Sequence, residues 1–127
     1  MTRVLVVDDE ELMLRSLLRS LSATFEIHVA SSGSEALDKL RAQPGYVVIM
    51  SDLNMPNMNG ARFLQLAHAL SPDSMQILLT GTVGFERVLG PAEENGIFLY
   101  LTKPCRNSVI VDGIHAAVAE HARRAAS

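Results

Sequence analysis

The sequence predicts an α/β fold in which a doubly wound, five-stranded parallel sheet is covered on both faces by five helices. Short apolar runs of strand length alternate along the chain with segments of helical periodicity. The run Val47–Met50 is apolar at consecutive positions, as a central strand buried on both faces requires. Polar residues follow the apolar runs at their carboxyl ends, where open parallel sheets collect their chemistry.

The composition fits one globular domain over residues 1–127. Hydrophobic residues make up 48% of the chain and charged residues 20%, and the net charge of -3 argues against direct nucleic-acid binding. Cys105 is the one cysteine, which excludes an internal disulfide and fits a reducing compartment. The apolar run before Asp8 is too short for a signal peptide, and no stretch is long enough to span a bilayer. We therefore expect a cytoplasmic protein without membrane contact.

The first half of the chain predicts two strands, each followed by a helix. The strands are expected at Arg3–Val7 and Glu26–Ala30. A helix over residues 11–22 follows the first strand, because four leucines recur there at helical spacing: Leu14, Leu17, Leu18 and Leu21. The second helix starts at Ser32–Glu35, which has the form of a capping box, and ends before Pro44–Gly45. Its expected inner face consists of Ala36, Leu37 and Leu40.

The second half predicts three more strands, at residues 46–51, Gln76–Leu79 and Ile97–Leu101. A helix follows the turn at 57–60, and its expected inner face consists of Phe63, Leu64, Ala67 and Leu70. The last helix is expected over residues 107–124, with Ile110, Ile114, Ala117 and His121 on one face.

The segment between the fourth and fifth strands has a weaker helical pattern than the others. Gly84, Gly90 and Pro91 all fall within it. Because proline inside a helix costs roughly 3 kcal/mol, we expect a helix that is broken or shortened near residue 90.

Polar residues follow four of the five predicted strands. Asp8 and Asp9 come after the first strand, Asp52 after the third, Thr80 after the fourth and Lys103 after the fifth. Since the carboxyl ends of parallel strands share one edge of the sheet, these side chains should form a single constellation.

This set of residue types is suited to phosphoryl transfer. Three converging carboxylates need a positive charge to offset their repulsion, and carboxylate and carbonyl oxygens favour Mg²⁺. A lysine ammonium and a threonine hydroxyl can both meet phosphoryl oxygens. Asp52 is then the expected nucleophile, with Mg²⁺ and Lys103 offsetting the charge of the transferred group.

Four segments, in this order and spacing, resemble the receiver domain of two-component response regulators: VLVVDDE, SDLNMPNMNG, LLTG and YLTKP. The resemblance covers essentially the whole chain. It implies a flavodoxin-like sheet with the strand order 2-1-3-4-5.

The resemblance also implies a role for each matching residue. Asp52 accepts the phosphoryl group, Thr80 donates a hydrogen bond to it, and Lys103 forms an ion pair with it. The expected Mg²⁺ ligands are Asp52, Asp9 directly, Asp8 through water, and the backbone carbonyl of Asn54. Tyr100 matches the aromatic residue that turns inward with Thr80 when the domain switches, and a cis peptide bond is expected between Lys103 and Pro104.

The partners follow from the same resemblance. The donor is a phosphohistidine of a sensor histidine kinase or a phosphotransfer protein, and the only catalysis expected is self-phosphorylation and self-dephosphorylation of Asp52. Phosphorylation is expected to switch the surface of the fourth helix, fifth strand and fifth helix, which regulates an output domain or partner and can support a homodimer.

Two other functions are compatible with parts of the pattern. A Mg²⁺-dependent phosphatase of the aspartyl-phosphate type needs a second carboxylate two residues after its nucleophile, where this chain has Asn54. A pseudo-receiver that serves as a docking module needs no phosphoryl chemistry, and the presence of Asp9, Asp52, Thr80 and Lys103 argues against it.

Overall fold

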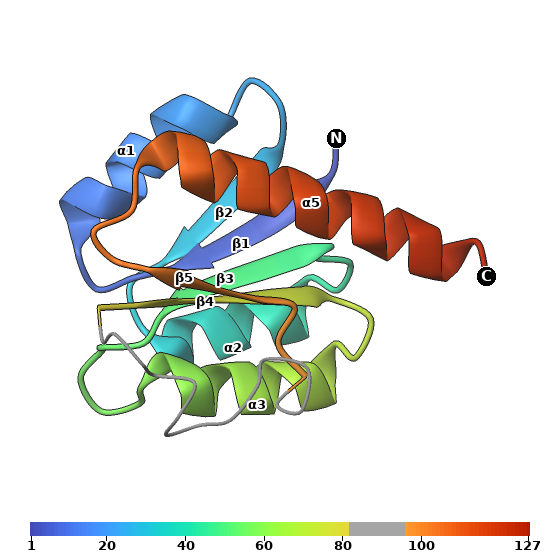
Figure 1. Ribbon diagram of the computed structural model, residues 1–127. Helices are drawn as coiled ribbons and strands as arrows, with labels where there is room; N and C mark the ends of the chain where they lie inside the picture. The colour runs from blue at the N-terminus through green and yellow to red at the C-terminus, as the bar shows by residue number, and fades with distance from the viewer. Residues whose placement is uncertain (82–95) are drawn as a thin grey trace.

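The computed structural model describes residues 1–81 and 96–127, and it has one sheet as its centre (Figure 1). The strands are β1 (Arg3–Val7), β2 (Glu26–Ala30), β3 (Val48–Asp52), β4 (Met75–Thr80) and β5 (Leu99–Thr102). Their order is β2-β1-β3-β4-β5, and every neighbouring pair is parallel. This confirms the predicted flavodoxin-like sheet.

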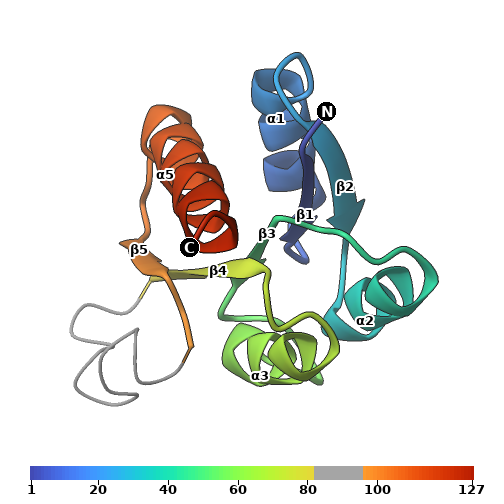
Figure 2. The ribbon, with the colours of Figure 1, turned by 90° about the vertical axis from the view of Figure 1, so that its right-hand side faces the viewer.

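Helices cover both faces of the sheet, as a doubly wound fold requires. Within the described residues they are α1 (Glu11–Leu21), α2 (Gly33–Ala42), α3 (Gly60–Leu70) and α5 (Asn107–Ala125). Figure 2 shows α1 and α5 together on one face and α2 and α3 together on the other. The broken helix expected near residue 90 lies outside the described residues.

The ends of three strands differ from the prediction by one or two residues. Strand β3 begins and ends later than the predicted 46–51, and β5 is likewise displaced towards the carboxyl end, whereas β4 is longer at both ends. Pairing explains the gains, because Asp52 is in register with Leu79 and Thr80 with Thr102. Apolar character marks where a strand lies, but the neighbouring strand decides where its ladder stops.

The sheet separates two apolar clusters. The cluster under α2 and α3 includes Leu5, Ile49 and Phe63, and the cluster under α1 and α5 includes Val6, Met50 and Ile114. Most residues of the expected inner faces are buried, but Leu18 and His121 are only half-buried, and Leu70 is 46% exposed. Leu70 is the last residue of α3, and helical spacing carries no information on how far the sheet extends beneath a helix end.

The start of α2 differs from an ideal capping box in one contact. The Ser32 side chain accepts a hydrogen bond from the Glu35 amide at 3.1 Å, as expected of an N-cap. The Glu35 carboxylate, however, accepts from the amide and the hydroxyl of Ser31 at 2.9 and 2.8 Å. These contacts lower the pKa of Glu35, and they anchor the loop between β2 and α2.

Ser32→Ala should lower the free energy of unfolding by about 1 kcal/mol, because the orphan amide of Glu35 loses its acceptor. Thermal unfolding followed by circular dichroism measures the loss. Ser34→Ala, in the exposed part of the same turn, is the matched control and should change stability by less than about 0.5 kcal/mol. Equal effects of the two substitutions would contradict the capping role of Ser32.

None of the helices in the described part of the chain combines the length and apolar character needed to cross a membrane.

Candidate functional site

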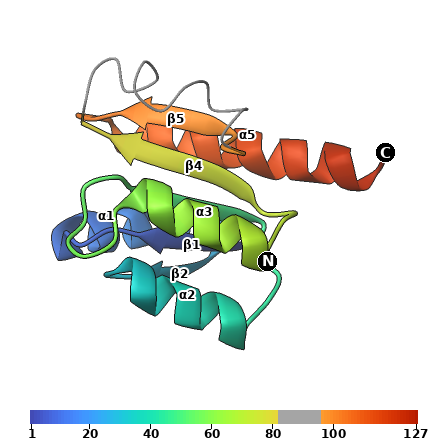
Figure 3. The ribbon, with the colours of Figure 1, turned by 90° about the horizontal axis from the view of Figure 1, so that it is seen from below.

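The carboxyl ends of the strands meet at one edge of the sheet, because every neighbouring pair of strands is parallel. Figure 3 shows the common direction for β4 and β5. Asp8 and Asp9 directly follow β1, Asp52 ends β3 and Thr80 ends β4. The β5 ladder brings Lys103 to the same edge, because the Lys103 amide donates to the Thr80 carbonyl at 2.7 Å. The structure therefore brings together all five residues that the strand-end argument selected.

Three carboxylates converge at this edge. Asp8, Asp9 and Asp52 each present an oxygen, and these oxygens all lie within 4.8 Å of one another. Asp8 and Asp52 are buried and Asp9 is exposed, so the cluster opens to solvent on the Asp9 side. Carboxylate oxygens at this spacing fit a hard divalent cation such as Mg²⁺.

Lys103 supplies positive charge to the cluster. Its Nζ lies 2.7 Å from Asp52 Oδ1 and 3.8 Å from Asp8 Oδ2. Burial lowers the pKa of Lys103, but the contact with Asp52 and the charges of Asp8 and Glu10 outweigh burial, so the pKa is raised overall. The lysine is therefore held as an ammonium beside the carboxylate that is the expected nucleophile.

The pKa of Asp8 is raised from 3.8 to about 6. Burial is the largest cause, and the negative charge of Asp52 adds to it. The Glu10 amide, which donates to Asp8 Oδ1 at 2.9 Å, and the Lys103 ammonium oppose the shift. The net result is that the charged form of Asp8 is disfavoured, which a bound cation would counteract.

Asp52 Oδ1 is buried and accepts no hydrogen bond from the described part of the chain. Its close neighbour is the Lys103 ammonium, which lies 2.7 Å away and forms an ion pair with it. A buried carboxylate oxygen normally has such a partner. Asp52 Oδ1 therefore has capacity to bind a further electrophile, which fits both a metal ion and a phosphorus centre.

The remaining predicted residues surround this cluster. Thr80 is buried at the end of β4, and Asn54 is exposed in the loop that follows β3. Tyr100 lies half-buried in β5, in register with Leu78, and packs against the core cluster under α2 and α3. The peptide bond between Lys103 and Pro104 is cis.

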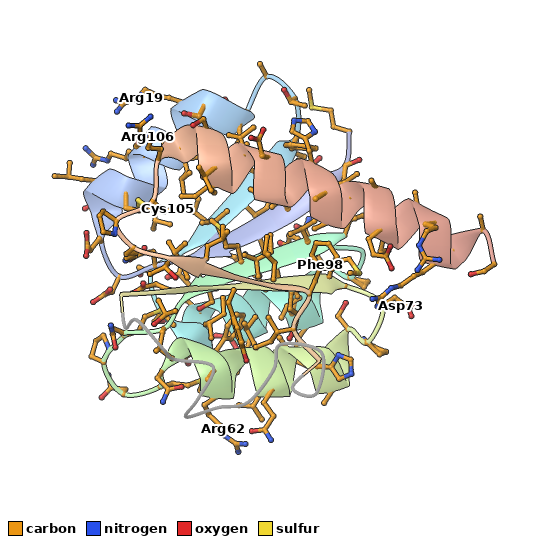
Figure 4. All side chains as sticks on the ribbon, viewed as in Figure 1. Arg19, Arg62, Asp73, Phe98, Cys105 and Arg106 are labelled. Atoms are coloured by element: carbon orange, nitrogen blue, oxygen red, sulfur yellow. The ribbon has the colours of Figure 1, made fainter. Side chains whose placement is uncertain are left out.

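Cys105 follows Pro104 in the turn that leads from β5 to α5 (Figure 4). Its side chain is half-buried against the core cluster under α1 and α5. Burial raises the pKa of the thiol, so the thiolate that reacts with oxidants and electrophiles is disfavoured. The cysteine is near the site without sharing its chemistry.

The sequence reasoning missed two residues that hold the Asp52 backbone. Ser51 Oγ donates to the Asp52 carbonyl oxygen at 2.9 Å. Gly60 comes so close that a Cβ built on it would lie 2.0 Å from the same oxygen. The signal for Ser51 is a hydroxyl within an apolar strand, and the signal for Gly60 is a glycine at the start of a helix, where other residues are more favourable.

The chain is similar to known proteins along most of its length. Residues 4–115 match the sequence model of the response regulator receiver domain. The hydrogenase transcriptional regulatory protein HoxA of Cupriavidus necator is 34% identical over 115 residues, which cover 91% of this chain and 24% of HoxA. The chain spans about a quarter to a half of the length of the curated relatives it matches.

Two solved structures have the same fold over nearly the whole chain. A crystal structure described as adenylate cyclase from Rhodopirellula baltica is 34% identical, with a TM-score of 0.93 and coverage of 99% of this chain and 94% of that chain. A CheY-like response regulator receiver domain protein from Methanospirillum hungatei JF-1 is 26% identical, with a TM-score of 0.88 and coverage of 98% of each chain.

Proposed function

Because this chain belongs to the response regulator receiver domain family, we propose that it receives a phosphoryl group on Asp52 from a phosphohistidine in a Mg²⁺-dependent reaction. Receiver domains are regulatory modules of two-component systems rather than conventional enzymes, and they bind Mg²⁺ at an acidic pocket. The observation that carries the proposal is the Asp52 carboxylate, which lies 2.7 Å from the Lys103 ammonium and within 4.8 Å of two other carboxylates.

The chemistry assigns a distinct task to each residue. An Asp52 oxygen attacks phosphorus, the bond from phosphorus to the donor imidazole nitrogen breaks, and the electron pair leaves with that nitrogen, which takes up a proton. Lys103 and the Thr80 hydroxyl meet the phosphoryl oxygens. Asp9, Asp52, the Asn54 carbonyl and, through water, Asp8 would hold Mg²⁺, which would supply positive charge to the phosphoryl oxygens.

Burial of the carboxylates strengthens their interaction with Lys103. Asp8 and Asp52 are almost completely buried, so the interaction of Lys103 with its carboxylates is screened less than it would be at the surface. The domain provides fixed charges around the transferred group, and no described residue is in position to serve as a second acid or base two places after Asp52, where Asn54 stands. This supports capture of one phosphoryl group over turnover of many substrate molecules.

The switch is proposed to act through Thr80 and Tyr100. Phosphorylation adds roughly two negative charges and new acceptor oxygens, which draw Thr80 and Lys103 towards Asp52. Tyr100 lies in β5 two residues before Thr102, which is the residue that pairs with Thr80 of β4. An inward turn of Tyr100 would then change the surface around β5 and α5, which is the expected surface for an output partner or a second copy of the chain.

The output is proposed to reside in another domain or protein. HoxA is a transcriptional regulatory protein, and the structure from Rhodopirellula baltica is described as an adenylate cyclase. These two relatives resemble the chain equally well in sequence, at 34% identity, although their described activities differ. Similarity in the receiver therefore does not select an output.

Incubation with acetyl phosphate and Mg²⁺ should add one phosphoryl group to the purified protein, as measured by intact mass. Asp52→Asn should abolish the addition, because it removes the nucleophilic carboxylate. Asp73→Asn is the matched control, since Asp73 is exposed in the turn between α3 and β4, at the other end of the sheet (Figure 4).

Three outcomes would contradict the proposal. A folded wild-type protein that never gains a phosphoryl group would support the docking module instead. Sustained hydrolysis of phosphate esters would support the phosphatase. Labelling that persists in Asp52→Asn would place the acceptor at another residue.

A further inference from the structure

Ser51 occupies a position where the strand pattern favours an apolar residue. Alternate residues of β3 face the same layer, and Ile49 and Leu53 on either side of Ser51 belong to the core cluster under α2 and α3. Ser51 itself is completely buried, with 0% exposure. A hydroxyl in such surroundings is unfavourable unless it forms a hydrogen bond.

The Ser51 hydroxyl finds its acceptor in the backbone of Asp52. Ser51 Oγ lies 2.9 Å from the Asp52 carbonyl oxygen and donates to it. The amide of the same peptide is also held, because the Leu53 N–H donates to the Leu79 carbonyl of β4 at 2.8 Å. Two hydrogen bonds therefore hold the peptide that links Asp52 to Leu53, one at its carbonyl and one at its amide.

The start of α3 also packs against the peptide that links Asp52 to Leu53. The Gly60 amide donates to the Leu53 carbonyl at 2.8 Å, and a Cβ on Gly60 would lie 2.8 Å from the Asp52 carbonyl carbon and 2.9 Å from Ser51 Oγ. The Asp52 carbonyl group is thus enclosed between the Ser51 hydroxyl and the first residue of α3. A side chain much larger than serine at position 51 would press on this contact.

We propose that Ser51 is a positioning residue for the phosphoryl acceptor. Its hydroxyl holds the Asp52 peptide in one orientation, and that peptide determines where the Asp52 carboxylate lies relative to Lys103, 2.7 Å away. The same peptide leads into the loop that carries Asn54. This inference rests on the proposed phosphorylation of Asp52, and it adds a residue that acts on the reaction through the backbone without touching the phosphoryl group.

The expected consequence concerns rate more than stability. Without the hydroxyl, the peptide keeps only the Leu53 hydrogen bond of these two. Its orientation is then less restricted, so the carboxylate spends less time in the reactive geometry. Loss of one such hydrogen bond corresponds to about a tenfold change in a rate that depends on this geometry. Binding of the phosphoryl donor should change little, because Ser51 is completely buried and cannot contact it.

Ser51→Ala removes the hydroxyl with the smallest change in volume, and Ser51→Cys retains the size but replaces a strong hydrogen-bond donor by a weak one. The matched control is Ser74→Ala. Ser74 is also a buried serine whose hydroxyl donates to a backbone carbonyl, that of Tyr46 at 2.6 Å, but it precedes β4 at the opposite end of the sheet.

The experiment measures the rate of labelling by acetyl phosphate at saturating Mg²⁺ over a range of donor concentrations, together with thermal unfolding of each variant. We expect both Ser51 variants to lower the maximal rate about tenfold and to change the half-saturating donor concentration by less than about twofold. Ser74→Ala should lose a similar amount of stability and keep the wild-type rate.

A Ser51→Ala protein that is labelled within about twofold of the Ser74→Ala rate would overturn the inference and leave Ser51 as a packed core residue. A fall in rate that is equal in Ser51→Ala and Ser74→Ala would overturn it as well, because the cause would then be general destabilisation. A wild-type protein that is never labelled would refute the proposed function itself, which is a different result from a rate defect in Ser51 variants.

Discussion

Gly60→Ala is expected to lower the free energy of unfolding by about 3 kcal/mol, because a Cβ at this position overlaps the backbone of the central strand. The added atom would lie 2.0 Å from the Asp52 carbonyl oxygen and 2.8 Å from the carbonyl carbon. Backbone atoms of a buried strand cannot move aside as the end of a flexible side chain can. Helix α3 must therefore shift away from β3, and the hydrogen bond from the Gly60 amide to Leu53 is lost.

Helix propensity alone predicts the opposite sign for this substitution. Alanine is more favourable than glycine within a helix by up to about 1 kcal/mol. A measured stabilisation of Gly60→Ala would therefore show that the close approach to Asp52 does not control this position. Urea unfolding followed by circular dichroism measures the difference.

Gly81→Ala is the matched control for size and location. Gly81 directly follows Thr80 at the same edge of the sheet, and a Cβ built on it meets nothing within 4 Å. Its effect on the free energy of unfolding should be smaller than about 0.5 kcal/mol. The contrast between the two glycines separates the steric contact at Gly60 from any general effect of adding a methyl group near the site.

The metal-free protein should lose about 2 kcal/mol of stability between about pH 4 and about pH 8 through Asp8 alone. The pKa of Asp8 is raised from 3.8 to about 6 in the folded protein. Between these two values the folded state binds more protons than the unfolded state, so the free energy of unfolding falls as the pH rises. Above the folded pKa, the full cost of the buried charge is present.

Asp8→Asn should remove this component of the pH dependence. Asparagine keeps an oxygen that can accept the hydrogen bond of the Glu10 amide, but it carries no charge. In a chelator, the variant should be more stable than the wild type at about pH 8 and close to it at about pH 4, as measured by urea unfolding. Parallel pH profiles of the two proteins would contradict the assignment to Asp8.

Addition of Mg²⁺ at about pH 8 should stabilise the wild-type protein, because an ion that binds the folded state alone shifts the unfolding equilibrium. The gain should be smaller in Asp8→Asn, since that variant has less unbalanced negative charge to offset. Equal stabilisation of both proteins would indicate that the ion binds away from Asp8.

Much of the fold could be predicted because its signals are local. The alternation of apolar runs with helical periodicity placed all five strands within two residues of their positions, and it placed the four described helices. The strand-end argument also selected the residues that meet at the site, because parallel strands have their carboxyl ends at a common edge. The strand order itself came from the resemblance to receiver domains.

Other features depend on contacts between distant segments. Leu70 fits the inner face of α3 by spacing, yet it is exposed, because burial depends on what lies beneath the helix end. The Glu35 carboxylate was expected to complete a capping box, but it binds Ser31. In both cases the local pattern is compatible with the expected contact, but the neighbouring segments determine whether Leu70 is buried and which residue Glu35 binds.

By itself, the sequence determined the parallel α/β architecture and the set of acids, hydroxyl and ammonium that meet at one edge, since both follow from chain-local periodicity and the direction of the strands. Only the tertiary structure decided how Asp52 is held there, because Ser51, Asp52 and Gly60 are brought into contact by the packing of α3 against β3. That packing depends on distances between backbones, which residue types and their spacing do not specify.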